Sequence, residues 1–200
     1  SPEKQHALWF GARIDPGRKV LEVAELDPNS PAALAGLKIG DRIEKLNGTK
    51  PRSFIDFTRT LLSLGTQDPV NLTIRRQGKP MQVSVRLISE KDFFDNKLLE
   101  KLLGIQVVEN TPHLIRQMGV PPYRGFVISG VKRGSKADKA GLKPEQLVLA
   151  IDERQPRSVT ELAKYIFRKS SGDELNFYYL FPKIRGRYVT FHEGRSKVEL

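Results

Sequence analysis

The side chains that could support nucleophilic or metal-dependent chemistry in this sequence are few, because it contains three histidines and no cysteine. A catalytic triad needs a nucleophile, a histidine and a carboxylate within hydrogen-bond reach of one another. His6, His113 and His192 stand in three unrelated segments, and no group of His, Asp and Glu has the spacing of metal ligands. Without cysteine, disulfides and thiol nucleophiles are also excluded. The sequence therefore predicts no catalytic residue, no metal site and no cofactor.

Net charge and hydropathy exclude further classes of function. The formal charge is +11, but basic and acidic residues alternate along the chain without a long run of one sign. This pattern favours a solvated basic surface over a nucleic-acid interface. No stretch is apolar over the length needed to span a membrane, and the first residues lack the features of a signal peptide.

An internal repeat indicates how the chain is organised. The segment 29–38 (NSPAALAGLK) recurs as 134–143 (GSKADKAGLK), and at the same offset of 105 residues Pro51-Arg52-Ser53 returns as Pro156-Arg157-Ser158. Two copies with so long a period are typical of two homologous domains and not of a solenoid.

Local signals predict the same order of elements in both copies. The predicted elements of the first copy are a strand at Val20–Leu26, a short helix at Pro31–Ala35, a strand at Arg42–Leu46, a longer helix capped by Ser53, and a hairpin at 70–76 and 81–87. Those of the second copy are a strand at Phe126–Val131, helices at Lys136–Ala140 and Val159–Phe167, a strand at Leu147–Asp152, and a hairpin at Leu175–Phe181 and Tyr188–His192. This composition predicts an α+β fold.

The second copy departs from the first in two places. Gly40-Asp41 becomes Glu145-Gln146, which removes a glycine from a turn and predicts that the turn is reshaped. An insertion, Thr111–Arg124, includes a predicted short helix at Pro112–Met118.

The run from Ser30 to Ile43 (SPAALAGLKIGDRI), followed by Leu46-Asn47-Gly48, resembles the PDZ domains of the HtrA/Deg serine proteases. The resemblance covers residues 7–88 and 101–192. It implies two PDZ-like domains, 1–92 and 101–200, each a small, mostly antiparallel barrel or sandwich capped by one short and one long helix. Residues 93–100 are predicted to be a helical linker, apolar enough to dock against one of the domains.

The resemblance also implies a peptide-binding groove in each domain, entered by a glycine-containing loop that holds a terminal carboxylate. The matching loops are Trp9-Phe10-Gly11-Ala12 and Leu103-Gly104-Ile105. Glycine allows close approach of the backbone, and consecutive N–H groups can form an anion nest. The following residues, Arg13-Ile14 and Gln106-Val107, would pair with the ligand as an added strand. Trp9 is equally consistent with the groove and with the core.

Helical periodicity predicts which side chains form the other wall of each groove. If Phe54, Phe57 and Leu61 face the core, the neighbouring face presents Ile55, Thr58 and Leu62. The offset of 105 assigns Thr160, Ala163 and Phe167 to the same positions in the second domain. Because the side chains differ in size, we expect the two domains to prefer different ligands.

The leading functional prediction is a module that binds extended peptides or protein C-termini and is the non-catalytic region of an HtrA-like protease. The protease nucleophile motif Gly-Asn-Ser-Gly-Gly does not occur, which disfavours an intact hydrolase. The resemblance implies an upstream protease domain and a homo-oligomer as partners, and a periplasmic or, in a eukaryote, an organellar location. The alternative is a scaffold whose grooves are closed and which acts through its surfaces.

Overall fold

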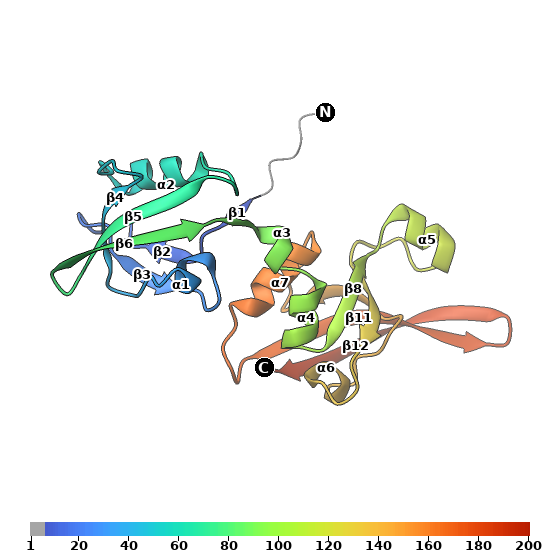
Figure 1. Ribbon diagram of the computed structural model, residues 1–200. Helices are drawn as coiled ribbons and strands as arrows, with labels where there is room; N and C mark the ends of the chain where they lie inside the picture. The colour runs from blue at the N-terminus through green and yellow to red at the C-terminus, as the bar shows by residue number, and fades with distance from the viewer. Residues whose placement is uncertain (1–6) are drawn as a thin grey trace. The chain divides into compact units, whose positions relative to one another are not determined.

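The computed structural model describes residues 7–200, which divide into two compact units (Figure 1). The first unit ends at Phe93 and the second begins at Phe94. The strand pairings in both are antiparallel, and helices accompany the sheets, as the predicted α+β class requires. Within residues 7–200, no helix has the length and apolar character needed to cross a membrane.

Residues 7–93 of the first unit form three small open sheets and its helices. Its strands pair in the orders β1-β7, β2-β3 and β4-β5-β6, so the described sheets form an open, sandwich-like arrangement and not a closed barrel. The elements are β1 (Leu8–Trp9), β2 (Ala12–Ile14), β3 (Val23–Leu26), α1 (Pro31–Leu34), β4 (Arg42–Leu46), α2 (Phe54–Leu62), β5 (Pro69–Arg76), β6 (Lys79–Arg86), β7 (Ile88–Ser89) and α3 (Glu90–Phe93).

The core of the first unit lies between β5 and α2. Alternate residues of β5, Val70, Leu72 and Ile74, are fully buried, as the period of a strand with one buried face requires. From α2, Phe57 is buried, and Phe54, Leu61 and Leu64 pack against the same cluster. This arrangement confirms the core face predicted from the helical period.

An ion pair braces the turn before β4. The carboxylate of Asp41, 1% exposed, accepts two hydrogen bonds of 2.7 Å from the guanidinium of Arg76 and one of 2.8 Å from the N–H of Lys38. Burial by itself raises the pKa of Asp41, but the hydrogen bonds from Arg76 and Lys38 outweigh it and lower the pKa below its usual value. Asp41 is therefore held ionised inside the first unit.

The second unit is built on one five-stranded sheet of order β12-β11-β10-β9-β8, which leaves β8 at an edge. The elements are α4 (Asn96–Leu102), β8 (Ile105–Glu109), α5 (Pro112–Met118), β9 (Phe126–Val131), α6 (Lys136–Lys139), β10 (Leu147–Ile151), α7 (Val159–Phe167), β11 (Glu174–Arg185) and β12 (Tyr188–Glu199). The ranges predicted for the inserted helix and for Val159–Phe167 agree with α5 and α7.

The last hairpin is longer than the sequence pattern predicts. β11 and β12 pair continuously from Glu174↔Glu199 to Arg185↔Tyr188 around a two-residue turn. Figure 1 shows this ribbon projecting beyond the rest of the sheet. At its tip Ile184 is 74% and Tyr188 79% exposed. Strand pairing therefore continues beyond the point where one face is buried.

The turn before β10, in which Glu145 stands where the first copy has Gly40, has the same conformation as the turn before β4. Glu145 has φ 72°, close to the 90° of Gly40 at the equivalent position. The side chain of Gln146 accepts a 3.0 Å hydrogen bond from the N–H of Lys143, as Asp41 does from Lys38. The predicted reshaping is wrong, because the buried side-chain cap holds the backbone in the left-handed region even for a residue that disfavours it.

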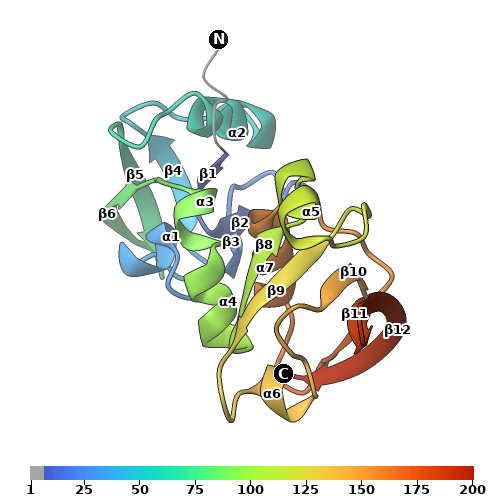
Figure 2. The same cartoon turned by 90° about the vertical axis from the view of Figure 1, so that its right-hand side faces the viewer.

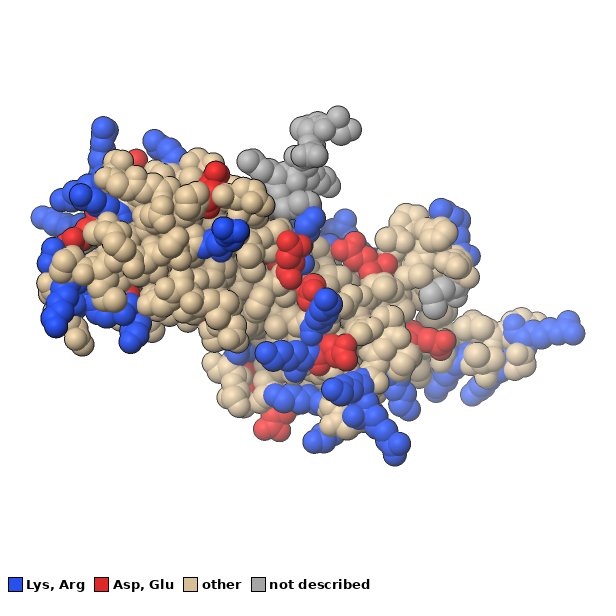
Figure 3. Space-filling model, in the orientation of Figure 1, with Lys and Arg blue, Asp and Glu red and all other residues tan. Residues whose placement is uncertain are grey.

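The charged side chains are dispersed over the surface. Figure 3 shows Lys and Arg on both units, with Asp and Glu among them on the visible face. Many of the described charges pair, for example Lys197 with Glu174 at 3.1 Å. Exposed pairs of this kind contribute little stability.

Candidate functional site

The glycine loop of the first unit is fixed by the start of α1. The N–H of Ala32 donates to the carbonyl of Phe10 at 3.0 Å, and the N–H of Asp27 donates to the carbonyl of Gly11 at 2.7 Å. Gly11 has φ 87°, and a Cβ at this position would lie 2.0 Å from Cβ of Ser30. Glycine is therefore required by both backbone conformation and space.

The carbonyls of this loop are bonded, but its N–H groups are available. Among residues 7–200, no hydrogen-bond acceptor pairs with the N–H of Phe10 or of Gly11. Two successive free N–H groups in a loop that contains a left-handed residue can receive an anion.

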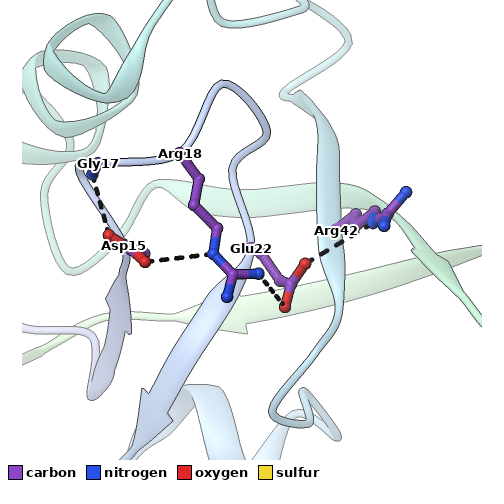
Figure 4. Close-up of polar contacts among 5 residues, drawn as sticks. All are labelled: Asp15, Gly17, Arg18, Glu22 and Arg42. Atoms are coloured by element: carbon purple, nitrogen blue, oxygen red, sulfur yellow. Dashed lines mark hydrogen bonds and ion pairs between the residues drawn. The ribbon is translucent and has the colours of Figure 1, made fainter.

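The strand after the loop, β2, pairs with β3 only, so its second edge is free of described strands. Ile14 is buried, Ala12 is half-buried and packs against the core, and Arg13 is exposed and pairs with Glu25. Past β2, Arg18 contacts Asp15 at 3.3 Å and Glu22 at 3.2 Å (Figure 4).

The loop 15–22, which contains these ion pairs, occupies the position at which the second copy has its insertion. Figure 4 also shows the N–H of Gly17 donating to Asp15 at 2.9 Å and Arg42 reaching Glu22 at 3.7 Å. The contacts of Asp15 and Glu22 with Arg18 hold the turn between β2 and β3, the contact with Arg42 joins it to β4, and β2 is followed by β3 with no helix between them.

The helix α2 presents an exposed apolar face. Ile55 is 66% and Leu62 70% exposed, and Thr58 between them is half-buried. With Phe54, Arg59 and Ser63 they line a shallow hollow of about 480 Å³. Ile55 and Leu62 lie two turns apart on the same face of α2, and exposed apolar surface of this kind can mark a binding site. Phe10 of the loop contacts Phe57 of α2 with ring centroids 6.5 Å apart, which joins loop and helix through the core.

Trp9 belongs to the core. Its side chain is 4% exposed, and its ring lies 4.3 Å from that of Phe93. Its indole N–H donates to Asp27 at 3.2 Å, which meets the polar requirement of a buried indole. Through Asp27, whose N–H bonds the carbonyl of Gly11, Trp9 is linked to the glycine loop.

The second unit repeats the loop geometry. The N–H of Ala137 donates to the carbonyl of Leu103 at 3.0 Å, and the N–H of Lys132 to that of Gly104 at 2.7 Å. Gly104 has φ 84°, and an added Cβ would lie 2.2 Å from Cβ of Ser135. The two glycine loops are therefore structurally equivalent in their carbonyl contacts.

The surroundings of the second loop differ because α4 packs beside it. Helix α4 contacts both β8 and α7, as the two views in Figures 1 and 2 agree. Phe94 and Leu99 are fully buried, and Leu98 is 8% exposed. The segment predicted as a linker, 93–100, thus lies mainly within the second unit, where its apolar side chains dock.

The predicted site residues of the second unit are largely covered. Leu103, Gly104, Ile105, Val107 and Ala163 are buried. Thr160 and Phe167 are half-buried, and Gln106 is exposed. The equivalents of Thr160 and Phe167 in the first unit, Ile55 and Leu62, are exposed, so the two helix faces differ in accessibility as well as in side-chain size.

A hollow of about 860 Å³ elsewhere in the second unit surrounds Asp152. This carboxylate accepts 2.7 Å hydrogen bonds from the hydroxyl of Tyr165 and the N–H of Asn176, and Lys169 lies 3.6 Å away. Burial raises the pKa of Asp152, but these hydrogen bonds outweigh it and lower the pKa. Each partner of Asp152 is already engaged, so we assign this cluster a structural role.

The two histidines within residues 7–200 lie on separate elements and do not form a site with each other. His113 and His192 are exposed on α5 and β12, and His6 lies outside the described residues. Within the described chain, no group of three His, Asp or Glu side chains could hold a metal ion.

Comparison with known proteins identifies the domain in both units. A PDZ domain is recognised over residues 9–87 and a second PDZ domain over residues 127–173. These ranges fall inside the two structural units and together cover more than half of the chain. The chain belongs to the PDZ-domain family and carries two copies of the domain.

The tandem is similar to the DegP and HtrA serine endoproteases. A probable periplasmic serine endoprotease DegP-like of Chlamydia pneumoniae is 28% identical over 80% of this chain and 35% of the relative. Its counterpart from Chlamydia trachomatis is 32% identical over 76% of this chain and 31% of the relative. The solved HtrA-type protease AlgW with decapeptide shares 20% identity over 66% of this chain and 40% of that one, with a TM-score of 0.42. The chain spans about a third of the curated relatives it matches.

Sequence reasoning missed the position of α4 and the role of Asn96, whose side-chain amide bonds the backbone of Val107. The apolar residues Phe94, Leu98 and Leu99 did indicate from the sequence that this segment docks, but not that it docks beside β8 and α7.

Proposed function

We propose that the first unit binds the C-terminal end of an extended peptide between β2 and α2, and that the chain is the non-catalytic, substrate- or partner-recruiting region of an HtrA-like protease. The observation that carries this proposal is the exposed apolar face of α2, Ile55 and Leu62, in a PDZ domain whose loop N–H groups at Phe10 and Gly11 have no acceptor among residues 7–200.

The chemistry of binding follows from these groups. The free N–H groups would hold the terminal carboxylate, and charge-assisted hydrogen bonds are stronger than neutral ones. The peptide backbone would extend the sheet at the free edge of β2. Burying Ile55 and Leu62 against apolar ligand side chains would add affinity in proportion to the area removed from water.

The names of the relatives support a setting for this activity. Proteins called periplasmic serine endoproteases match over most of the chain, and the domains recognised here are both PDZ domains. We infer a periplasmic location in a bacterium, an upstream protease domain and a homo-oligomeric parent. The alternative role, a scaffold with closed grooves, is supported for the second unit by the contacts of α4 with β8 and α7.

The test is a binding screen of the full chain against a random peptide library with free C-termini, followed by titration of selected peptides. Amidating the C-terminus should weaken binding at least about tenfold, since hydrogen bonds to a charged group contribute about 1.5–3 kcal/mol. The substitutions Ile55→Glu and Leu62→Glu together should weaken it by at least about tenfold while leaving unfolding unchanged, because both side chains are exposed.

A matched control is Leu34→Glu, which alters an equally exposed leucine on α1, at the opposite side of the first unit from α2 in Figures 1 and 2. It should leave peptide affinity unchanged. Binding that ignores the carboxylate, or that survives the double substitution on α2, contradicts the proposal.

A further inference from the structure

At the outer edge of β8, where no strand pairs, the side chain of Asn96 forms the hydrogen bonds that a neighbouring strand would form. In a sheet of order β12-β11-β10-β9-β8, the outer edge of β8 is where an added peptide strand would pair. There the amide of Asn96 donates from Nδ2 to the carbonyl of Val107 at 2.9 Å and accepts at Oδ1 from its N–H at 2.8 Å. One side-chain amide thus satisfies both backbone groups that a ligand residue would use.

The loop N–H groups of the same unit are also engaged. The carbonyl of Leu99 accepts from the N–H of Leu103 at 2.9 Å and from that of Gly104 at 3.2 Å. This oxygen belongs to α4 and takes the two donors whose counterparts at Phe10 and Gly11 lack an acceptor among the described residues. The C-terminal end of α4 therefore engages both N–H groups that would otherwise be available to a terminal carboxylate.

The helix wall of the second groove carries a third contact from the same segment. The ring of Phe94 meets that of Phe167 edge-on, with centroids 5.5 Å apart, and Lys164 lies over Phe94 at 5.9 Å. On the outer face, Gln106 donates to Glu100 of α4 at 2.8 Å. The segment 94–102 therefore contacts the edge strand, the loop and the helix wall of one groove.

The first unit serves as an internal comparison. Ala163 is fully buried, whereas Thr58 at the same position of α2 is half-buried. Ile55 and Leu62 are exposed, whereas Thr160 and Phe167 are half-buried. Two grooves with equivalent loops thus differ in whether described residues cover them.

We propose that α4 is an internal ligand of the second groove, so that this groove binds a peptide terminus only after α4 is released. The inference rests on the proposed function, because it assumes that these grooves recognise peptides. An occluded site has its apparent affinity reduced by the fraction of molecules in which it is open. The wild-type chain should accordingly bind peptide through its first unit and exclude it from its second.

The experiment uses the full chain carrying Ile55→Glu and Leu62→Glu, so that the first groove is disabled, with and without Asn96→Ala. Alanine preserves the helix but removes both hydrogen bonds to Val107. Losing two such bonds should favour the open groove by about thirtyfold. We expect carboxylate-dependent binding of the peptide library to rise by at least tenfold, and amide exchange at Leu103, Gly104 and Val107 to accelerate.

A matched control is Asn110→Ala, because Asn110 also bridges backbone carbonyls of this unit, those of Pro121 and Tyr123 at 2.9 and 2.8 Å, but does not contact α4 through them. It should not expose the groove. Three results overturn the inference: exchange that accelerates without new binding, exchange that is unchanged by Asn96→Ala, and binding equally tight with Asn96 present. Failure of the proposed function is distinguished separately, because it appears as absent binding in the chain with both grooves unaltered.

Discussion

Gly11 packs so closely against Ser30 that a side chain at position 11 should destabilise the first unit. A Cβ at Gly11 would lie 2.0 Å from Cβ and 2.4 Å from Oγ of Ser30, a fully buried side chain. Gly11 also has φ 87°, which costs a residue with a Cβ about 1–2 kcal/mol. Forcing a methyl into a packed site adds about 1–3 kcal/mol. Gly11→Ala should therefore destabilise the first unit by about 3 kcal/mol.

A second substitution separates the two costs. Ser30→Gly removes both close atoms, and the remaining neighbour, Cα of Ser30, is 3.4 Å away, an ordinary contact. Glycine at an N-cap costs only a few tenths of a kcal/mol relative to serine. The double variant Gly11→Ala with Ser30→Gly should thus recover about 2 kcal/mol, leaving the backbone cost.

The assay is urea unfolding followed by the fluorescence of Trp9, the single tryptophan in the chain, which is buried in the first unit. The equivalent pair Gly104→Ala and Ser135→Gly, with contacts of 2.2 and 2.4 Å, should behave alike when read by circular dichroism. If Gly11→Ala and the double variant are equally unstable, crowding by Ser30 is not the reason that glycine is needed. If Gly11→Ala costs nothing, the loop geometry itself is contradicted.

Two further predictions concern the turns before β4 and β10. Asp41→Asn should destabilise the first unit by about 2 kcal/mol at neutral pH, because it weakens the pairing with Arg76. Since the pKa of Asp41 is lowered in the folded state, the stability that the ionised carboxylate contributes is complete above the unfolded-state pKa of about 3.9 and is lost as pH falls through the folded-state pKa. The urea midpoints of variant and wild type should therefore converge in acid, and a constant gap between them would contradict the pairing. Glu145→Gly should stabilise the second unit by about 1 kcal/mol, because φ 72° favours glycine. The variant should therefore have a higher thermal unfolding midpoint than the wild type, and a lower midpoint would show that the glutamate is not strained.

Helix positions could be predicted from the sequence because their caps are local. Ser30, Ser53 and Ser158 each accept a hydrogen bond from an N–H three residues later, so helix starts are encoded within one turn of chain. The core face of α2 followed from its period for the same reason. The repeat then allowed each assignment to be checked against a second copy.

What could not be predicted depends on contacts between distant segments. The continuation of β11 and β12 past Phe181 and His192 is set by cross-strand pairing, because the alternation there has no buried face to specify it. The pairing of Asn96 with Val107 joins residues on separate elements, and no spacing rule connects them. At Glu145 a contact between distant segments outweighs a local preference, because its N–H donates to the carbonyl of Ile128 at 2.9 Å while its φ stays left-handed.

The helix α4, which closes the second groove, is also the first helix of the second unit. In the chain, Phe94 and Asp95 lie between the end of α3 at Phe93 and the start of α4 at Asn96. Tension along the chain would therefore enter the second unit at the N-terminal end of α4 and reach Asn96 before Leu99. Contacts loaded from one end fail in sequence, and a sequence of small failures needs less force than a simultaneous one. We therefore expect a pull along the chain to separate Asn96 from Val107 before it separates Leu99 from Gly104, and so to open this groove from one end.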